Sequence, residues 1–386
     1  MIMKLLAAIV VVGIVCPLVV AAGDPPLVFA SFGFGTAVSA YGYKSIESAL
    51  LTYPSMETFI LGILENDDEK KHSSMLNESA KTKMTFMKQL TEEYLYPIDR
   101  HGNRQTVTDF SLAHIRAIGL TLRYVQKHHP NAHLVYHDLD ILHFQPTLHG
   151  AFHKTFTLGL MTRQTQLAAA NNCGLIMFHN SRIDEAASFF EFALHLYVHG
   201  GYITKRLEDP KSHSCCSQHS IQHALELILG SAEWERGYSE YTYHHRSVHA
   251  VVDAPSCVTK FPGITKSFTL MSYPFRFFAP PADPSSRSQL QPFSETGALH
   301  YKGDLKSYMA ADYTKMLTLL ADGYSLSEVA LKIYASYKTS FCNTPCCLKN
   351  VDCPVDRKVR GPITATCSKH PSFVSKNYPS NFWELF

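Results

Sequence analysis

The 386-residue sequence has no large excess of either charge and no internal repeat. It carries 35 lysines and arginines against 33 aspartates and glutamates, which gives a formal net charge of +2. Because no broad basic field exists, we expect no nucleic-acid partner. Hydrophobic residues make up 46% of the chain. This is an ordinary globular composition, and the length suits one large α/β domain or two smaller ones.

The N-terminus carries a pattern that is typical of secreted proteins. After Lys4, residues 5–22 contain no charged side chain, and Gly23-Asp24-Pro25-Pro26 follows. A cationic start, an apolar stretch and a small-residue end indicate a signal peptide, although the run can also act as an uncleaved single-pass membrane anchor. Pro17 and the small residues favour cleavage. We therefore assign residues 1–22 to a signal peptide or signal anchor and expect the rest in the lumen of the ER or Golgi, anchored or secreted.

Ten cysteines fit such an oxidising lumen. Five of them crowd the C-terminal tail: Cys342, Cys346, Cys347, Cys353 and Cys367. Their spacing fits no common zinc module, so we expect disulfide bonds in this tail rather than a zinc site. Asn77-Glu78-Ser79 is an acceptor sequence for N-glycosylation in a polar stretch that should be exposed.

Predicted strands and helices alternate along the chain. Strands are expected at 27–31, 58–63, 133–137, 155–161 and 174–178, and helices at 45–52, from 108 or 109 to about 129, at 184–198 and at 218–229. Residues 65–105 are polar and stay unassigned, and two further helices are expected after Ser307. This alternation predicts βαβ units and a mainly parallel sheet flanked by helices.

The most informative segment is the one that contains Asp138 and Asp140, directly after the apolar strand 133–137. Ligands of such sheets bind beyond the carboxyl ends of the strands. Two carboxylates two residues apart can turn towards one divalent cation where the strand ends. Mn²⁺ and Mg²⁺ prefer oxygen ligands and often bind together with substrate phosphates. The segment therefore predicts a metal site for a diphosphate-containing substrate, whereas the same motif in a random loop would indicate a solvated turn.

A second segment, His300-Tyr-Lys-Gly303-Asp-Leu-Lys306, fits the same site. A histidine can complete the coordination of the metal, a glycine lets the backbone approach a phosphate, and a lysine supplies a compact positive charge. In isolation this pattern is equally typical of a surface turn. Its occurrence together with Asp138 and Asp140 favours the diphosphate site.

The two segments together resemble the retaining GT-A glycosyltransferases of the glycogenin and bacterial galactosyltransferase type, within the nucleotide-diphospho-sugar transferases. The resemblance implies a GT-A, Rossmann-like fold over residues 27–310, with 311–386 as a helical and cysteine-rich extension. It also implies that Asp138, Asp140 and His300 hold Mn²⁺ or Mg²⁺, and that Gly303 and Lys306 contact the diphosphate of a nucleotide sugar, with a UDP-sugar as the expected donor.

Two further segments agree with the resemblance. Asn172 matches an asparagine that contacts the donor sugar together with Asp138, and its alternative is a polar turn before a core strand. Gln218 matches a glutamine that faces the reacting sugar carbon, and its alternative is a residue at the end of a helix. Ser217 departs from the pattern because the family usually has an aspartate there. A serine is uncharged and shorter, which puts the donor and catalysis in doubt, although Ser217 can serve as a helix N-cap.

Three other residues allow a functional interpretation but favour a structural one. Arg116 can lie near the diphosphate, but a solvated helix face is the favoured interpretation. Tyr41 and Tyr43 can stack on a nucleobase, but packing in the core is favoured.

The function expected from the sequence is metal-dependent, hexosyltransferase-like transfer of a sugar to a glycan, protein or lipid acceptor, with retention. One alternative is a metal-dependent phosphoesterase, which often needs two metals and more ligands. Another is a non-catalytic lumenal binding protein with a degenerate GT-A fold.

Overall fold

A computed structural model describes residues 24–33, 37–90, 110–162, 171–199, 217–229, 246–249, 261, 263–264, 268–273, 297–301 and 306–341. The predicted signal or anchor at 1–22, Gly303 and the five tail cysteines lie outside the described residues. Within those ranges, no helix combines the length and the apolar character needed to span a bilayer.

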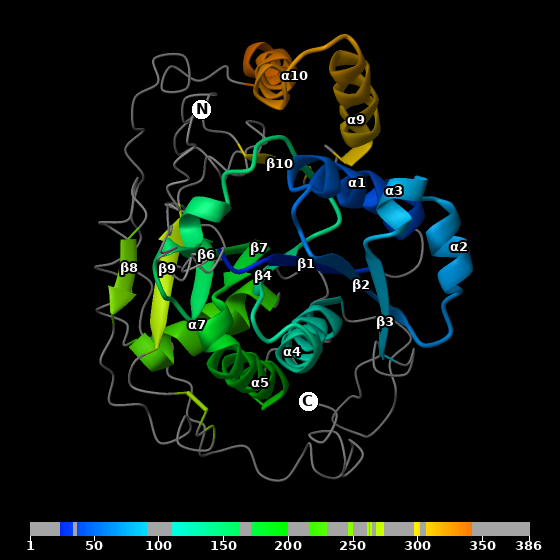
Figure 1. Ribbon diagram of the computed structural model, residues 1–386. Coiled ribbons are helices and arrows are strands. Elements are labelled where there is room, and N and C mark those ends of the chain that lie inside the picture. The colour runs from blue at the N-terminus through cyan, green and yellow to red at the C-terminus, as the bar shows by residue number, and fades with distance from the viewer. Residues whose placement is uncertain are drawn as a thin grey trace, which may run out of the picture.

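An eight-stranded sheet forms the centre of the molecule (Figure 1), in the order β3-β2-β1-β4-β7-β6-β9-β8. Its strands are β1 (Leu27–Phe32), β2 (Thr58–Leu64), β3 (Met84–Leu90), β4 (His133–His137), β6 (Leu158–Thr162), β7 (Asn171–Phe178), β8 (Arg246–His249) and β9 (Thr269–Tyr273). Four of its seven strand pairs are parallel, whereas β7 runs antiparallel to both neighbours and β8 antiparallel to β9. The prediction of a mixed, mainly parallel sheet flanked by helices is confirmed.

Helices cover both faces of this sheet (Figure 1). On one side lie α4 (Phe110–His128), α5 (Ile183–His199) and α7 (Ser217–Leu229); on the other lie α1 (Tyr43–Thr52), α2 (Glu69–Ser74) and α3 (Glu78–Lys81). Strand β1 has apolar side chains on both faces: Val28 packs in the cluster of α4, and Phe29 packs in that of α1. A strand buried on both sides reads as a continuous apolar run, which is why its position was predictable.

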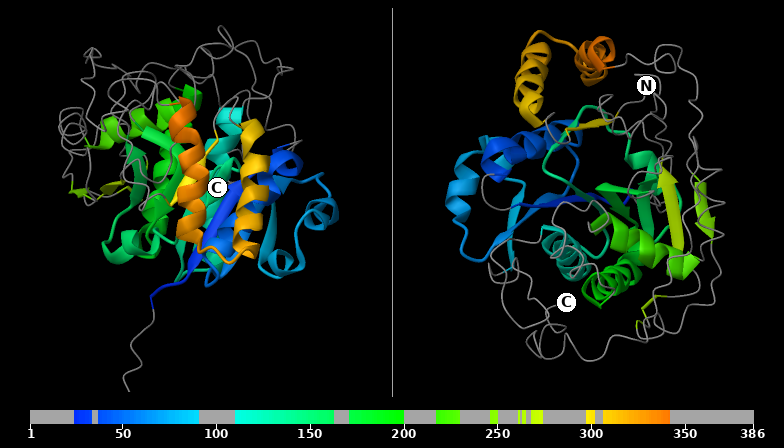
Figure 2. Two further views of the ribbon diagram at one scale, coloured as in Figure 1. Left: turned by 90° about the horizontal axis from the view of Figure 1, so that it is seen from above. Right: turned by 180° about the vertical axis from the view of Figure 1, so that it is seen from behind.

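A separate two-stranded ribbon carries the C-terminal helices. Strand β5 (Ile141–His143) pairs antiparallel with β10 (Ala298–His300). Helices α9 (Lys306–Ala321) and α10 (Leu326–Phe341) pack on this ribbon through a third apolar cluster, which includes Leu142, Leu299, Met309, Val329 and Ile333. Figure 2 shows the two helices standing together beside the sheet. Helix α9 runs across residue 310, where the sequence analysis divides the chain, and that division stays a prediction.

Hydrogen bonds tie α9 to the rest of the fold. The hydroxyl of Tyr301 donates to Asp312 over 2.8 Å. The hydroxyl of Tyr313 donates to the buried carboxylate of Glu47 on α1, and the same carboxylate accepts the backbone N–H of Asn77 over 2.7 Å. The start of α9 is therefore held in place relative to the main sheet.

Candidate functional site

The turn after β4 brings Asp138 and Asp140 to the carboxyl edge of the parallel strands. The N–H of Asp138 donates to the carbonyl of Gly174 on β7 over 2.8 Å, directly after His137, the last residue of β4 that pairs with β7. Leu139, between the two aspartates, is only 5% exposed. A Cβ added to Gly33, at the end of β1, would lie 2.4 Å from the Leu139 side chain. The buried leucine packs closely against Gly33 and anchors the turn.

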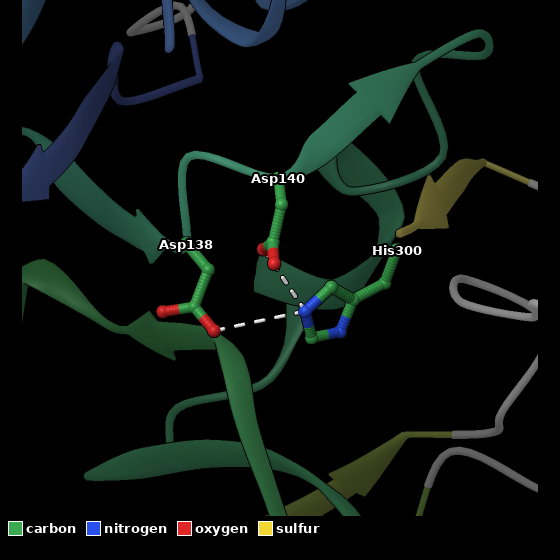
Figure 3. Close-up of side chains that lie close together, drawn as sticks. All are labelled: Asp138, Asp140 and His300. Atoms are coloured by element: carbon green, nitrogen blue, oxygen red, sulfur yellow. Dashed lines mark ion pairs between the residues drawn. The ribbon is translucent and has the colours of Figure 1, made fainter. Parts of the chain in front are cut away.

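His300 reaches the two aspartates from β10, 160 residues further along the chain. Strand β10 is aligned there by its pairing of His300 with Ile141 and by a 2.8 Å bond from the N–H of Tyr301 to the carbonyl of Asp140. The Nε2 atom of His300 lies 3.1 Å from Oδ1 of Asp140 and 3.7 Å from Oδ2 of Asp138. Figure 3 shows the three side chains pointing at one another. The expected convergence of these residues is present.

Lys306, the first residue of α9, adds a positive charge to the cluster. Its Nζ lies 3.0 Å from Oδ2 of Asp140 and 5.2 Å from the centre of the Tyr41 ring. Burial alone would lower the pKa of Lys306, but the charge of Asp140 and the hydrogen bond to it raise that pKa. Burial likewise favours the neutral form of Asp140, yet His300 and Lys306 outweigh it and hold the pKa of Asp140 well below its ordinary value. Asp140 is therefore a carboxylate at neutral pH.

This set of donors suits a divalent cation. One ligand atom each from Asp138, Asp140 and His300 lies within 4.8 Å of the others, and no other such group of three is found among the described residues. Mn²⁺ and Mg²⁺ can be bound by two carboxylates and one imidazole, a set in which two of the three ligand atoms are oxygen. Asp140 and His300 are buried, whereas the Asp138 side chain is 29% exposed. The cluster therefore has a closed side and a more open one.

A further histidine lies behind Asp138. His114, on α4, places Nε2 3.6 Å from Oδ1 of Asp138. Its Nδ1 lies 3.2 Å from the hydroxyl of Ser217. Burial lowers the pKa of His114 to about 4, although the charge of Asp140 opposes that shift, so the ring is neutral at pH 7. The sequence analysis missed His114, which is one of 21 histidines and stands in no recognisable motif.

Ser217 is the first residue of α7, whereas the sequence analysis offers it as the N-cap that precedes a helix. Helix α7 begins at Ser217 itself, which is 6% exposed. The side chain bonds to His114 on a neighbouring helix. Its position is thus explained by a tertiary contact as well as by the start of a helix.

Asn172 and Gln218 lie on two other elements, β7 and α7. Asn172 belongs to β7 and pairs with Met161 of β6, so it lies in a strand, not in a turn. Because β7 is antiparallel to β4, the N-terminal end of β7 and the end of β4 share one edge of the sheet. Gln218 is half-buried in the first turn of α7, next to Ser217.

The interpretation of Arg116 as a solvated residue is wrong, since only 1% of it is exposed. Helix α4 packs against α5 as well as the sheet, so its buried face is wider than the apolar stripe in its sequence. Tyr41 is half-buried and packs beside two of the apolar clusters, and Tyr43 packs beside one of these two. Both positions agree with the expected packing role.

The buried histidines predict how stability changes with pH. Burial lowers the pKa of His114 and that of His137 to about 4. Burial also lowers the pKa of His143 well below its ordinary value. Between pH 6.5 and 4 the unfolded chain binds protons at these residues that the native chain does not, so native stability falls as pH falls. Urea unfolding with a chelator should give a lower free energy of unfolding at pH 5 than at pH 7. An equal or higher value at pH 5 would contradict the neutral, buried state of these rings.

Comparison with known proteins gives structural but not sequence matches. No protein-family model and no curated protein matches the chain. The galactosyltransferase LgtC, solved with donor and acceptor sugar analogues, aligns with 82% of this chain and 97% of its own at 13% identity and a TM-score of 0.35. The apo-form glycosyltransferase GlyE of Streptococcus pneumoniae TIGR4 aligns with 81% of this chain and 64% of its own, at 8% identity and 0.40.

A glycosyltransferase involved in glycosylation of the major capsid of PBCV-1 aligns with 75% of this chain and 99% of its own, at 10% identity and a TM-score of 0.33. All three are glycosyltransferases, the class that the sequence motifs resemble. Their TM-scores are 0.40 or lower.

Proposed function

We propose that this chain is a metal-dependent glycosyltransferase that takes a sugar from a nucleoside diphosphate, with a UDP-sugar as the expected donor. One observation carries the proposal: Asp138, Asp140, His300 and Lys306 meet at the carboxyl edge of a mainly parallel sheet. Ligands of open α/β sheets bind at this edge. A cation site beside a lysine suits a diphosphate, which needs positive charge on more than one side.

The chemistry follows from charge. When bound, Mn²⁺ or Mg²⁺ supplies positive charge that stabilises the diphosphate as the glycosidic bond breaks. Asp138, Asp140 and His300 would hold it. The side chain of Lys306 is 40% exposed. Its ammonium group would turn from Asp140 to the phosphate oxygens and donate hydrogen bonds to them. Gly303 would let the backbone approach the same phosphates.

The remaining roles concern the sugar. Asn172 and Asp138 would contact the donor sugar, and Gln218 would face its reacting carbon. The acceptor, a glycan, protein or lipid, would attack on the side of the leaving group, so that the configuration is retained. The leaving phosphate would then accept the proton, and no dedicated general base is needed.

The alternatives predict different sites. A phosphoesterase with two metals needs further carboxylate or histidine ligands beside the first group. In the ranges that the structure describes, the three-ligand group stands alone, which favours transfer over hydrolysis. A non-catalytic binding protein would keep nucleotide binding but lose turnover, so a donor-hydrolysis assay separates it from an enzyme.

Thermal unfolding with UDP tests the proposal. UDP should raise the melting temperature by several degrees when Mn²⁺ is present, because a ligand at 100 times its Kd stabilises the native state by about 2.7 kcal/mol. UDP with a chelator should give no shift. Protection by UDP without metal would contradict the proposed site, and so would the absence of protection by every nucleoside diphosphate in the presence of Mn²⁺.

We also propose a lumenal location and glycosylation at Asn77. Asn77 is exposed at the start of α3, where its Oδ1 accepts the N–H of Ala80 over 2.8 Å. A glycan attaches to Nδ2, which takes no part in that bond. The helix cap and the modification are therefore compatible.

A further inference from the structure

We infer that His114 is a positioning residue, which links the metal-binding carboxylate of Asp138 to the first turn of α7. The inference rests on the proposed function and extends it to a residue outside the two motifs. It concerns how the site is held in place, because His114 lies behind Asp138 and not among the converging ligand atoms.

The two nitrogens of the ring face two different partners. Nδ1 and the hydroxyl of Ser217 lie within hydrogen-bonding distance, at 3.2 Å. Nε2 faces Oδ1 of Asp138 at 3.6 Å, the distance of an ion-pair contact. The other carboxylate oxygen, Oδ2, faces His300. The carboxylate of Asp138 is thus oriented from both sides, with one oxygen turned to the ligand cluster and the other to His114.

Aromatic neighbours fix the plane of the ring. The Phe110 ring lies stacked against His114, with 5.7 Å between ring centres and 13° between planes. The Tyr136 ring, on β4, lies 5.8 Å away at a tilt of 44°. These two ring contacts restrict the motion of the imidazole, which in turn limits the motion of the Asp138 carboxylate. Metal ligands in proteins are commonly oriented by a polar group behind them.

The link also explains how a serine can stand at position 217. The family resemblance leads one to expect a carboxylate there, which would reach towards its neighbours directly. The shorter serine reaches His114, and the imidazole spans the remaining distance to Asp138. Gln218 follows Ser217 in α7, so the same chain of contacts sets the position of Gln218 relative to the proposed metal site.

Metal affinity tests the link, measured by electron paramagnetic resonance with Mn²⁺ alone on the full-length protein. His114→Phe keeps a flat ring between Phe110 and Tyr136 but removes both polar contacts. Loss of such a supporting partner costs about 10- to 100-fold in metal affinity, so we expect a fall of about tenfold or more. His114→Gln, which restores an N–H near Asp138, should recover most of the affinity. His128→Phe, at the exposed end of the same helix, is the matched control and should bind as wild type does.

A double-mutant cycle separates positioning from packing. Ser217→Ala should weaken Mn²⁺ binding less than His114→Phe, and should add nothing in the His114→Phe background, because the link is already cut. Unchanged affinity in both His114→Phe and Ser217→Ala would overturn the inference, as would fully additive losses. If His114→Phe fails to fold, Ser217→Ala decides, because unchanged Mn²⁺ affinity in that variant would overturn the inference. If wild-type protein binds no Mn²⁺ at all, the proposed function is overturned and the inference with it.

Discussion

Replacing Asp140 by asparagine should abolish Mn²⁺-dependent nucleotide binding. Asp140 is the most central residue of the cluster: His300 lies 3.1 Å from one of its oxygens and Lys306 lies 3.0 Å from the other. An amide removes the negative charge of Asp140 and leaves His300 and Lys306 facing the site without it. Because losing even a supporting partner costs about 10- to 100-fold, we expect Mn²⁺ affinity to fall by more than about 100-fold.

The variant should remain folded, since the apolar clusters on both faces of the main sheet do not include Asp140. Titration of Mn²⁺ and then of UDP measures the effect, and circular dichroism checks the fold. Asp322→Asn, at the exposed end of α9, is the matched control. If Asp140→Asn binds Mn²⁺ as tightly as wild type, the metal site lies elsewhere.

Replacing Lys306 by alanine should weaken the binding of nucleoside diphosphate without weakening the binding of Mn²⁺. Lys306 contacts Asp140 in the structure, so its positive charge competes with a cation for that carboxylate. We therefore expect Mn²⁺ alone to bind at least as tightly as in wild type. Nucleoside diphosphate should bind about 10- to 100-fold more weakly, because a hydrogen bond to a charged group contributes about 1.5–3 kcal/mol.

Isothermal titration of Mn²⁺ and of UDP in saturating Mn²⁺ separates the two effects. Lys332→Ala removes an exposed lysine from α10 and should leave both affinities unchanged. An equal loss of metal and nucleotide affinity in Lys306→Ala would mean that the lysine supports the metal site and does not bind phosphate.

The sequence predicted the strands and helices that are buried on a continuous face. The strand at 133–137 matches β4 at both ends, and the apolar residues at helical spacing in α4 are all buried: Leu112, Ile115, Leu122 and Val125. Residues 65–105 show no clear pattern because α2 and α3 are short and follow the caps Asp68 and Asn77 in a polar stretch. Strand β3 lies at the edge of the sheet, where burial leaves a weak pattern.

The direction of β7 did not follow from the expected strand bounds. In the structure only residues 163–170 separate β6 from β7, too few for a parallel connection, which needs a crossover of about a dozen residues or more. The antiparallel direction matters, because it brings the N-terminal end of β7 to the edge where Asp138 lies.

In the site, the two motifs predicted which side chains meet, and tertiary contacts decided the rest. Asp138, Asp140, His300 and Lys306 stand in recognisable patterns. The contact of His114 with Ser217 joins residues 103 positions apart that belong to no shared motif. Arg116 is buried although its side chain is charged. Such pairings follow from how helices pack, and no local pattern records them.

The side chains of the cluster come from two separate stretches of the sequence. All eight strands of the main sheet lie between Leu27 and Tyr273, whereas His300 and Lys306 arrive later, on β10 and α9. A shortened form that stopped before residue 297 would retain every strand of the large sheet and both aspartates, yet would lack the imidazole and the lysine. Cleavage at that point would therefore remove two of the four side chains of the cluster while leaving every strand of the large sheet in the remaining chain.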